Sequence, residues 1–166
     1  MPIQPLKLRS ASRSTTGSQE TFAIPAQARK IVPAVSVAVV RRKTVLLVKR
    51  ARPPSQGLYA YPGGKVEPGE TLAQAAAREL KEETGLEARN YRPLREIHID
   101  GSGENHAVDY LLTVFGALYV GGEPVASDDA ETAAFYTLAE MAEMPLAGDV
   151  FSVAEDLLGP AQDARR

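Results

Sequence analysis

The chain has 166 residues, of which 44% are apolar and 24% charged, and this length and composition suit one globular domain with a sizeable core. Its formal net charge of −2 provides no global attraction to nucleic acid or to an anionic membrane, since both favour a basic surface. The absence of cysteine and the presence of only two histidines exclude disulfides, thiolate nucleophiles, cysteine-ligated zinc and a histidine-built metal centre. Oxygen ligands for a hard cation remain.

The two ends of the chain differ in amino-acid composition from its middle. Residues 1–22 are polar and small and have no apolar periodicity, so they cannot bury enough surface to offset the entropy of ordering. We therefore expect a flexible tail at 1–30, a folded domain at 31–160 and a disordered end at 161–166. The longest apolar stretch, residues 32–40, is too short and interrupted to span a bilayer. The N-terminus also lacks the apolar region of a secretory signal, so we expect a cytoplasmic protein.

The domain begins with strand signals. Residues 33–40 and 44–50 are β-branched runs separated by a basic turn, a pattern that predicts two neighbouring strands joined as a hairpin. The proline pair at 53–54 ends regular structure. A short strand is expected at 58–62, and it leads into the glycine pair at 63–64.

A helix follows. Residues 71–84 are rich in strong helix formers, and Gly85 is the residue best able to adopt the left-handed conformation beyond a helix end. The chain then reads as an extended segment at 94–100 and a turn at 101–105 that is rich in Gly, Ser and Asn.

The last third predicts two more strands and a second helix. Strands are expected at 106–120 and around 133–138, and apolar residues at helical spacing predict a helix within 149–159. Asp149 is placed as its N-cap and Gly159 as its stop. Strands before, between and after helices indicate a mixed α/β sandwich.

Three glutamates of the first helix form one charged face. Glu79, Glu82 and Glu83 stand at positions i, i+3 and i+4, so their side chains lie on the same side of the helix. Like charges at this spacing destabilise a helix. Something must therefore neutralise them, either the basic neighbours Arg78 and Lys81 on a solvated helix face or a bound cation.

The surroundings of this face suggest a divalent cation. Ala73, Ala77 and Leu80 form a separate stripe that we expect to dock on the sheet, which leaves the acidic face free. Glu70 can turn toward the same place, and the glycines at 63–64 let the backbone approach a ligand closely. Carboxylates with a carbonyl are the oxygen ligands that Mg²⁺ or Mn²⁺ prefers.

The helix and the loop before it carry a family motif. Residues 64–86 read GKVEPGETLAQAAARELKEETGL, which matches GX5EX7REUXEEXGU, where U is aliphatic, at every fixed position. The segment resembles the Nudix box, and the order of strands from about residue 31 to 160 is similar to the Nudix fold. The resemblance implies an α/β domain with a mixed sheet between helices and a metal-dependent pyrophosphohydrolase. Its substrates would be nucleoside diphosphates linked to another group.

The resemblance also implies roles for individual residues. Glu79, Glu82 and Glu83 would be the catalytic carboxylates, and Arg78 would hold a glutamate in orientation. Bound metal ions would neutralise a pyrophosphate and lower the pKa of an attacking water, so that no protein nucleophile is needed. The implied ligands of Mg²⁺ or Mn²⁺ are Glu79, Glu82, Glu83, Glu70 (directly or through water) and a backbone carbonyl of Gly63 or Gly64.

The candidates for substrate binding are residue types that also serve ordinary structural roles. They are Gly64, Lys65, Tyr61, Arg50 and Phe135. Two interpretations of Lys65 stay open: it contacts a phosphate of the substrate, or it is an ordinary exposed loop lysine. The aromatic residues stack on a base or belong to the core, where strand aromatics more often lie. His98 and His106 are expected at ordinary strand positions, without a catalytic role.

A general base outside the box is sought in a later acidic loop. Residues 127–138 resemble the loop that contributes in relatives cleaving ADP-ribose, and the candidates are Asp128, Asp129 and Glu131. Thr132 occupies the position where such relatives often have glutamate. A shift by one residue turns a strand side chain to the other face, and acids in a turn also act simply as turn formers.

The expected substrate is ADP-ribose or a related nucleotide sugar, because residues 49–70 look most like the members that cleave it. The alternative is a MutT-like enzyme that hydrolyses ordinary or oxidised nucleoside triphosphates, because the same helix serves both reactions. A third reading is a non-catalytic module that senses a nucleotide. We expect a small-molecule nucleoside diphosphate derivative as partner, with neither nucleic acid nor membrane, and a homodimer as one option for assembly.

Overall fold

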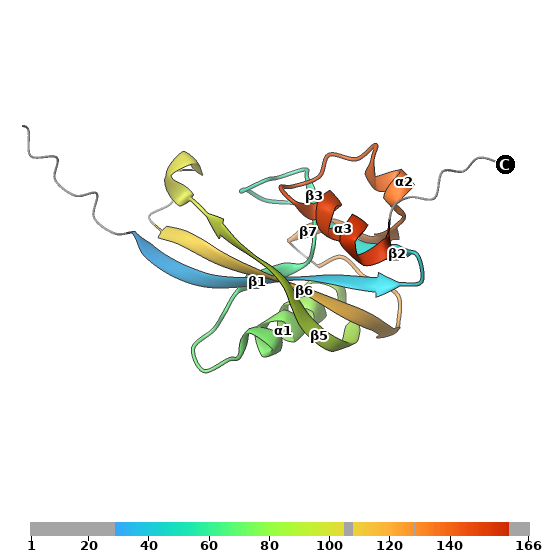
Figure 1. Cartoon of the computed structure of the whole chain (residues 1–166), viewed down its shortest axis with the longest axis horizontal. Helices are drawn as coiled ribbons and strands as arrows, with labels where there is room; N and C mark the ends of the chain where they lie inside the picture. The colour runs from blue at the N-terminus through green and yellow to red at the C-terminus, as the bar shows by residue number, and fades with distance from the viewer. Residues whose placement is uncertain (1–28, 105–107, 128, 160–166) are drawn as a thin grey trace, which may run out of the picture.

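The computed structural model describes residues 29–104, 108–127 and 129–159, and their strands form one mixed sheet. Figure 1 shows β1 and β6 crossing the middle of the molecule, where they pair in parallel, while β1 and β2 pair antiparallel. The main path runs β3-β2-β1-β6-β5; β4 also pairs with β1, and β7 with β2. The strands are β1 (Lys30–Arg41), β2 (Thr44–Arg50), β3 (Tyr59–Ala60), β4 (Gly63–Lys65), β5 (Glu87–Ile99), β6 (Val108–Gly121) and β7 (Ala130–Tyr136).

Helices cover both faces of this sheet. Helix α1 (Leu72–Thr84) lies on one side, while α2 (Leu138–Met141) and α3 (Val150–Leu158) lie on the other (Figure 1). Because strand side chains alternate between faces, β1 contributes Val35, Val37 and Val39 to the α1 side and Ala38 to the α3 side. The prediction of a mixed sheet between helices is confirmed. None of the helices in the described ranges is long and apolar enough to span a membrane.

The first hairpin and the first helix form where the sequence predicts them. Val40 pairs with Val45 across the β1–β2 turn. Helix α1 begins after Thr71, whose side chain accepts a hydrogen bond from the Gln74 amide in a capping box. It ends at Gly85, which has φ 71°, in the left-handed region that glycine adopts at little cost.

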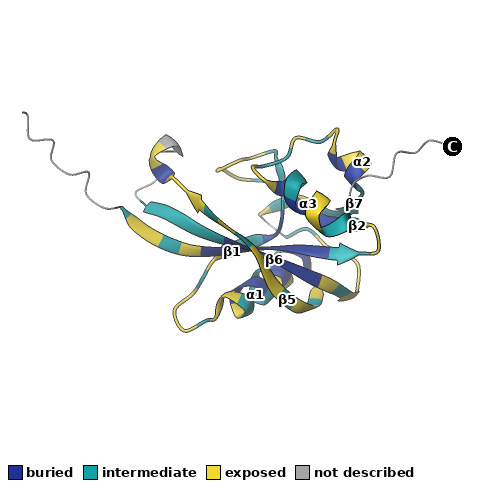
Figure 2. Cartoon of the chain, in the orientation of Figure 1, coloured by how far each residue is buried: buried dark blue, intermediate teal, exposed yellow. Residues whose placement is uncertain are grey.

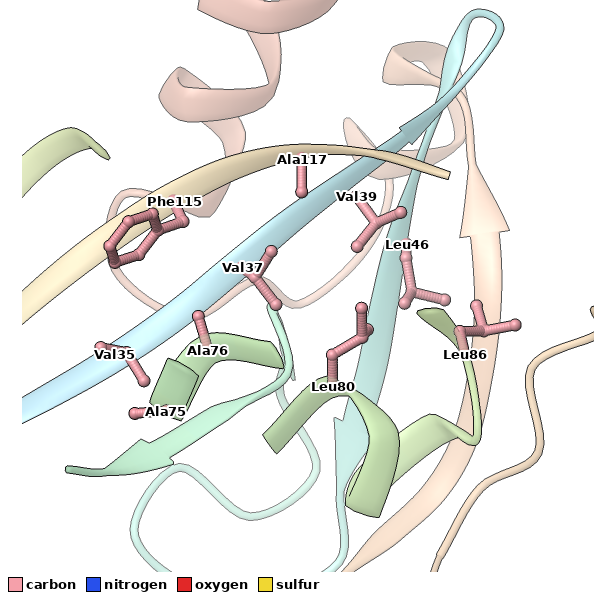
Figure 3. Packing of buried hydrophobic residues seen from close by; sticks show 10 residues of the cluster. All are labelled: Val35, Val37, Val39, Leu46, Ala75, Ala76, Leu80, Leu86, Phe115 and Ala117. Atoms are coloured by element: carbon pink, nitrogen blue, oxygen red, sulfur yellow. The ribbon is translucent and has the colours of Figure 1, made fainter. Parts of the chain in front are cut away.

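The buried side of α1 differs from the predicted stripe. Leu80 is buried, as predicted, but Ala73 and Ala77 are only half-buried, whereas Ala75 and Ala76 are completely buried. Figure 3 shows Ala75, Ala76 and Leu80 pointing at the valines of β1. The helix is turned about its axis relative to the predicted stripe because it packs against both β1 and β4.

Figure 2 shows the buried residues gathered where the helices overlap β1 and β6, while the outer parts of the strands are exposed. On the α3 side, the core is built from small and branched residues of the sheet and the helices. Its buried members are Ala38, Val45, Leu47, Tyr61, Val114, Leu138, Met141, Val150, Val153 and Ala154.

Several expected boundaries are wrong. β5 starts at Glu87, soon after the helix, and not near residue 94. The sequence pattern did not reveal this start, because three register shifts and the left-handed Asn90 interrupt the alternation of side chains along the strand. The strand expected at 133–138 starts at Ala130 and ends at Tyr136, and the unpredicted helix α2 follows.

The helix predicted within 149–159 is confirmed, but Asp149 makes no capping hydrogen bond. Its carboxylate lies 3.5 Å from Arg95 instead. A 3-10 turn at Gly101–Glu104 occupies the predicted turn. His106 and the segments 1–28 and 160–166 lie outside the described residues, whereas Lys30 already pairs with Val108 in the sheet.

Candidate active site

Two glutamates of α1 face the glycine strand β4. A Cβ on Gly64 would lie 2.5 Å from Cδ and 2.7 Å from Oε2 of Glu79, so the carboxylate rests directly against the Gly64 backbone. The Gly63 backbone also hydrogen-bonds the Glu83 carboxylate. Glycine is therefore required at position 64 because any side chain would occupy the place of the Glu79 carboxylate.

Glu83 is half-buried, and this burial affects its titration. Burial raises the pKa of Glu83 to about 7, and the nearby negative charge of Glu79 raises it further, while the Gly63 hydrogen bond and the positive charge of Arg50 oppose the shift. Two acids crowded in this way favour a cation between them.

Arg78 connects the remaining acids. Its Nε and Nη2 donate to the two carboxylate oxygens of Glu70 at 2.6 and 3.0 Å. Its Nη1 donates to Glu79 at 2.8 Å and to Glu82 at 3.1 Å, and Nη2 also reaches the backbone carbonyl of Lys65 at 3.0 Å. This fork of donors, the Nε, Nη1 and Nη2 groups of one guanidinium, depends on the planar geometry that only arginine offers. Glu70 is thus bound to Arg78, and its carboxylate also accepts from the amide of Glu67.

A divalent cation fits the chemistry of these donors. Among the described residues, no three acidic or histidine side chains form a ready ligand group. Arg78 pairs with three of the predicted carboxylates, Glu70, Glu79 and Glu82. Glu79 and Glu83, beside the backbone of β4, nevertheless form the oxygen-rich set that Mg²⁺ prefers. Glu82 has a side chain that is 60% exposed and is the most open of the predicted ligands.

An apolar cavity adjoins this cluster. It has a volume of about 450 Å³ and lies between the sheet and the start of α3, with Ile97, Leu112 and Val114 in its wall. Gly63 and Gly64 also line it, so β4 has the cavity on one side and the Glu79 carboxylate on the other. Its volume falls within the range of small-molecule sites.

The predicted substrate-binding residues occupy different places. Tyr61 lines the cavity, but it is buried, and its hydroxyl donates to the Val150 carbonyl at 2.7 Å. Phe135 packs on the α1 side beneath Arg41, whose guanidinium lies 3.9 Å from the ring centroid, and it does not line the cavity. Lys65 is exposed, with its ammonium 5.8 Å from a tyrosine ring. Arg50 lines the cavity.

The base candidates of the acidic loop are engaged in ion pairs. Glu131 lies 2.7 Å from Lys49, and Asp129 lies 2.8 Å from Arg52. Of Asp129 and Glu131, it is Asp129 whose negative charge raises the pKa of Glu83. Asp128 lies outside the described residues.

Sequence reasoning missed the cavity wall. Ile97 and Leu112 come from the paired strands β5 and β6, and Asp149 comes from the distant segment just before α3. The only available signal was the strand alternation that puts Leu112 and Val114 on one face of β6. That alternation does not reveal which helix covers the face.

Comparison with known proteins places the chain in a family. A family model described as the NUDIX domain matches residues 30–157. The chain therefore belongs to the Nudix hydrolase family, and its class is that of the Nudix pyrophosphohydrolases.

Relatives with two different named activities are similarly close. The chain is 39% identical over 112 residues to an ADP-ribose pyrophosphatase of Methanocaldococcus jannaschii, covering 64% of this chain and 63% of that relative's length. It is 36% identical over 139 residues to "Putative 8-oxo-dGTP diphosphatase 2" of Mycobacterium tuberculosis, covering 80% and 94%. A crystal structure of a MutT NUDIX hydrolase from Burkholderia pseudomallei is similar at a TM-score of 0.67 and 28% identity, covering 76% and 97%.

Proposed function

We propose that the chain hydrolyses the pyrophosphate bond of a nucleoside diphosphate linked to another group, with ADP-ribose or a related nucleotide sugar as the substrate. The observation that carries this proposal is the position of β4, which has acidic side chains of α1 on one side and an apolar cavity on the other. A diphosphate that follows Gly63 and Gly64 would have its nucleoside end in the cavity and its phosphorus atoms near the carboxylates. The archaeal relative's name supports this choice of substrate.

The proposed cofactor is Mg²⁺ or Mn²⁺, held by Glu79 and Glu83 with a backbone carbonyl of Gly63 or Gly64. When bound, such an ion neutralises a diphosphate and lowers the pKa of water. The chain's own contribution is orientation, because Arg78 donates to the Glu79 carboxylate that rests against Gly64 and is itself anchored on Glu70 and the Lys65 carbonyl.

Among the base candidates within the described residues, we favour Asp129 over Glu131. Both carboxylates form ion pairs, Asp129 with Arg52 and Glu131 with Lys49, but of the two it is the charge of Asp129 that acts on Glu83. This assignment predicts that Asp129→Asn lowers turnover more than Glu131→Gln does.

A MutT-like triphosphate hydrolase is the second candidate. Its support is the mycobacterial relative, whose alignment covers more of both chains than the archaeal one does. The acids of α1 would serve both reactions, and only the groups around the cavity would differ.

An assay with separated products tests the proposal. The chain is incubated with Mg²⁺ and ADP-ribose, dGTP or 8-oxo-dGTP, and products are resolved by chromatography. We expect AMP and ribose 5-phosphate from ADP-ribose, with no turnover in EDTA. Turnover of a triphosphate with ADP-ribose inert would favour the second candidate. Calorimetric Mg²⁺ binding without hydrolysis of any of these compounds would favour a nucleotide sensor. Cytoplasmic location and a homodimer stay predictions.

A further inference from the structure

Arg50 lies where the cavity and the carboxylate cluster meet. It lines the cavity together with Gly63 and Gly64, and its positive charge lowers the pKa of Glu83 on the other side of β4. Of the described residues that line the cavity, it is the only lysine or arginine. The single cationic group of the cavity is thus at the end nearest the acids.

The loop after β2 holds this side chain in place. The Arg50 amide donates to the Leu58 carbonyl at 3.0 Å, and the Gly57 amide donates to the Arg50 carbonyl at 2.9 Å, so the loop closes on Arg50. The Nε of Arg50 then donates to the Pro54 carbonyl at 2.7 Å. A second tether joins the loop to the acidic segment, through the Ala51 amide and the carbonyl of Asp129 at 3.1 Å.

The terminal nitrogens of Arg50 bind no side chain among the described residues. An arginine has five N–H donors, and one of them, on Nε, goes to Pro54. Among the described residues the structure shows no other side-chain hydrogen bond or ion pair for Arg50. The guanidinium therefore keeps four donors that bind no described residue, in a cavity wall that it shares with Gly63 and Gly64. A phosphate matches the planar array of donors that such a group offers.

We propose that Arg50 binds the phosphate attached to the nucleoside, so that the nucleoside lies in the apolar cavity and the second phosphate points past Gly63–Gly64 toward the acids of α1. This proposal rests on the proposed function, to which it adds the direction in which the substrate lies. The assignment of the phosphate to Arg50 follows from charge, because the other polar residues that line the cavity, such as Ser36 and Asp149, carry no positive charge.

The test measures binding of hydrolysis products in EDTA, where no turnover occurs. Calorimetry compares a nucleoside monophosphate with its own nucleoside, using the pairs AMP with adenosine and GMP with guanosine. For at least one pair, we expect the monophosphate to bind the wild-type chain about 10- to 100-fold more tightly, the range for hydrogen bonds to a charged group. Arg50→Ala should abolish this difference while leaving nucleoside affinity unchanged.

Two further variants make the test specific. Arg50→Gln keeps a donor for the Pro54 carbonyl but has no charge, so it should also lose the difference, with a melting temperature close to that of the wild type. Arg89→Ala removes an exposed arginine of β5 and should keep the full difference.

Four results would overturn the proposal: no monophosphate binds the wild type, Arg50→Gln keeps the full difference, Arg50→Ala weakens nucleoside and monophosphate equally, or Arg89→Ala acts like Arg50→Ala. Because these measurements need neither metal nor hydrolysis, they can succeed even if the proposed activity fails.

Discussion

The contact between Gly64 and Glu79 provides the sharpest test of the site. In Gly64→Ala, the new methyl group would lie 2.5 Å from the carboxylate carbon of Glu79, whereas ordinary contacts begin at 3.4 Å. Glu79 must therefore move by about 0.9 Å. Only the end of a flexible side chain has to shift, so we expect the fold to persist.

The expected effect on stability is small. An off-rotamer side chain costs roughly 0.5 to 1.5 kcal/mol, while replacing glycine at a position with ordinary φ stabilises by roughly 0.4 to 1 kcal/mol through the unfolded state. These terms nearly cancel. Activity should respond much more strongly, because a displacement of about 1 Å in a positioning group can lower the rate about 100-fold.

Thermal unfolding with and without Mg²⁺ measures the predicted loss of metal binding. A cation at one hundred times its Kd stabilises the folded chain by about 2.7 kcal/mol, which should raise Tm by roughly 5 to 10 °C at this chain length. Gly64→Ala should lose most of this shift and have a melting temperature in EDTA close to that of the wild type. Its kcat with ADP-ribose or a triphosphate should fall about 100-fold.

Two other glycines serve as controls. At Gly121 a Cβ would meet nothing within 4 Å, so Gly121→Ala should behave like the wild type. At Gly63 it would lie 2.6 Å from the Cα of Ser36 in the paired strand, so Gly63→Ala should destabilise the fold by about 3 kcal/mol. If Gly64→Ala kept wild-type turnover and the full Mg²⁺ shift, the assignment of Glu79 to the metal site would be wrong.

Three further substitutions test the same arrangement. Glu83→Gln should lower kcat about 100-fold with little change in unfolding temperature in EDTA, and undiminished Mg²⁺-dependent turnover would contradict its role. Arg78→Lys loses the fork that holds Glu70 and should weaken Mg²⁺ binding or activity about 10- to 100-fold, measured by calorimetry and initial rates; an unchanged Mg²⁺ affinity and rate would remove Arg78 from the site. Tyr61→Phe removes the buried hydrogen bond from the Tyr61 hydroxyl to the Val150 carbonyl and should lower the free energy of unfolding by about 1 kcal/mol in urea; a large rise in KM without this loss would instead make Tyr61 a substrate contact.

Local signals predicted the elements that local forces stabilise. The capping threonine, the run of helix formers and the final glycine lie within 15 residues of one another, so the bounds of α1 could be read directly from the sequence. The first hairpin was predictable for the same reason, because both strands adjoin their turn. β5 was not, because its bulges and the left-handed Asn90 hide its alternation.

The residue types of the candidate site were also visible in the sequence, whereas their partners were not. Glu79, Glu82 and Glu83 share a helix face at any orientation of the helix. Which of them lies against backbone depends on how α1 turns over β1 and β4, and the structure puts Glu79 on Gly64 and leaves Glu82 exposed. The docking stripe was misplaced because helical periodicity does not specify which neighbours the helix meets.

The sequence by itself determined the family and the acidic helix, because both depend on spacing within a short segment. Only the tertiary structure decided that β4 separates a cavity from the acids and that Arg50 lines this cavity beside β4. Those relations depend on pairing between strands far apart in the chain, such as β1 with β6. Such pairing is set by the packing of whole faces, which short-range patterns do not encode.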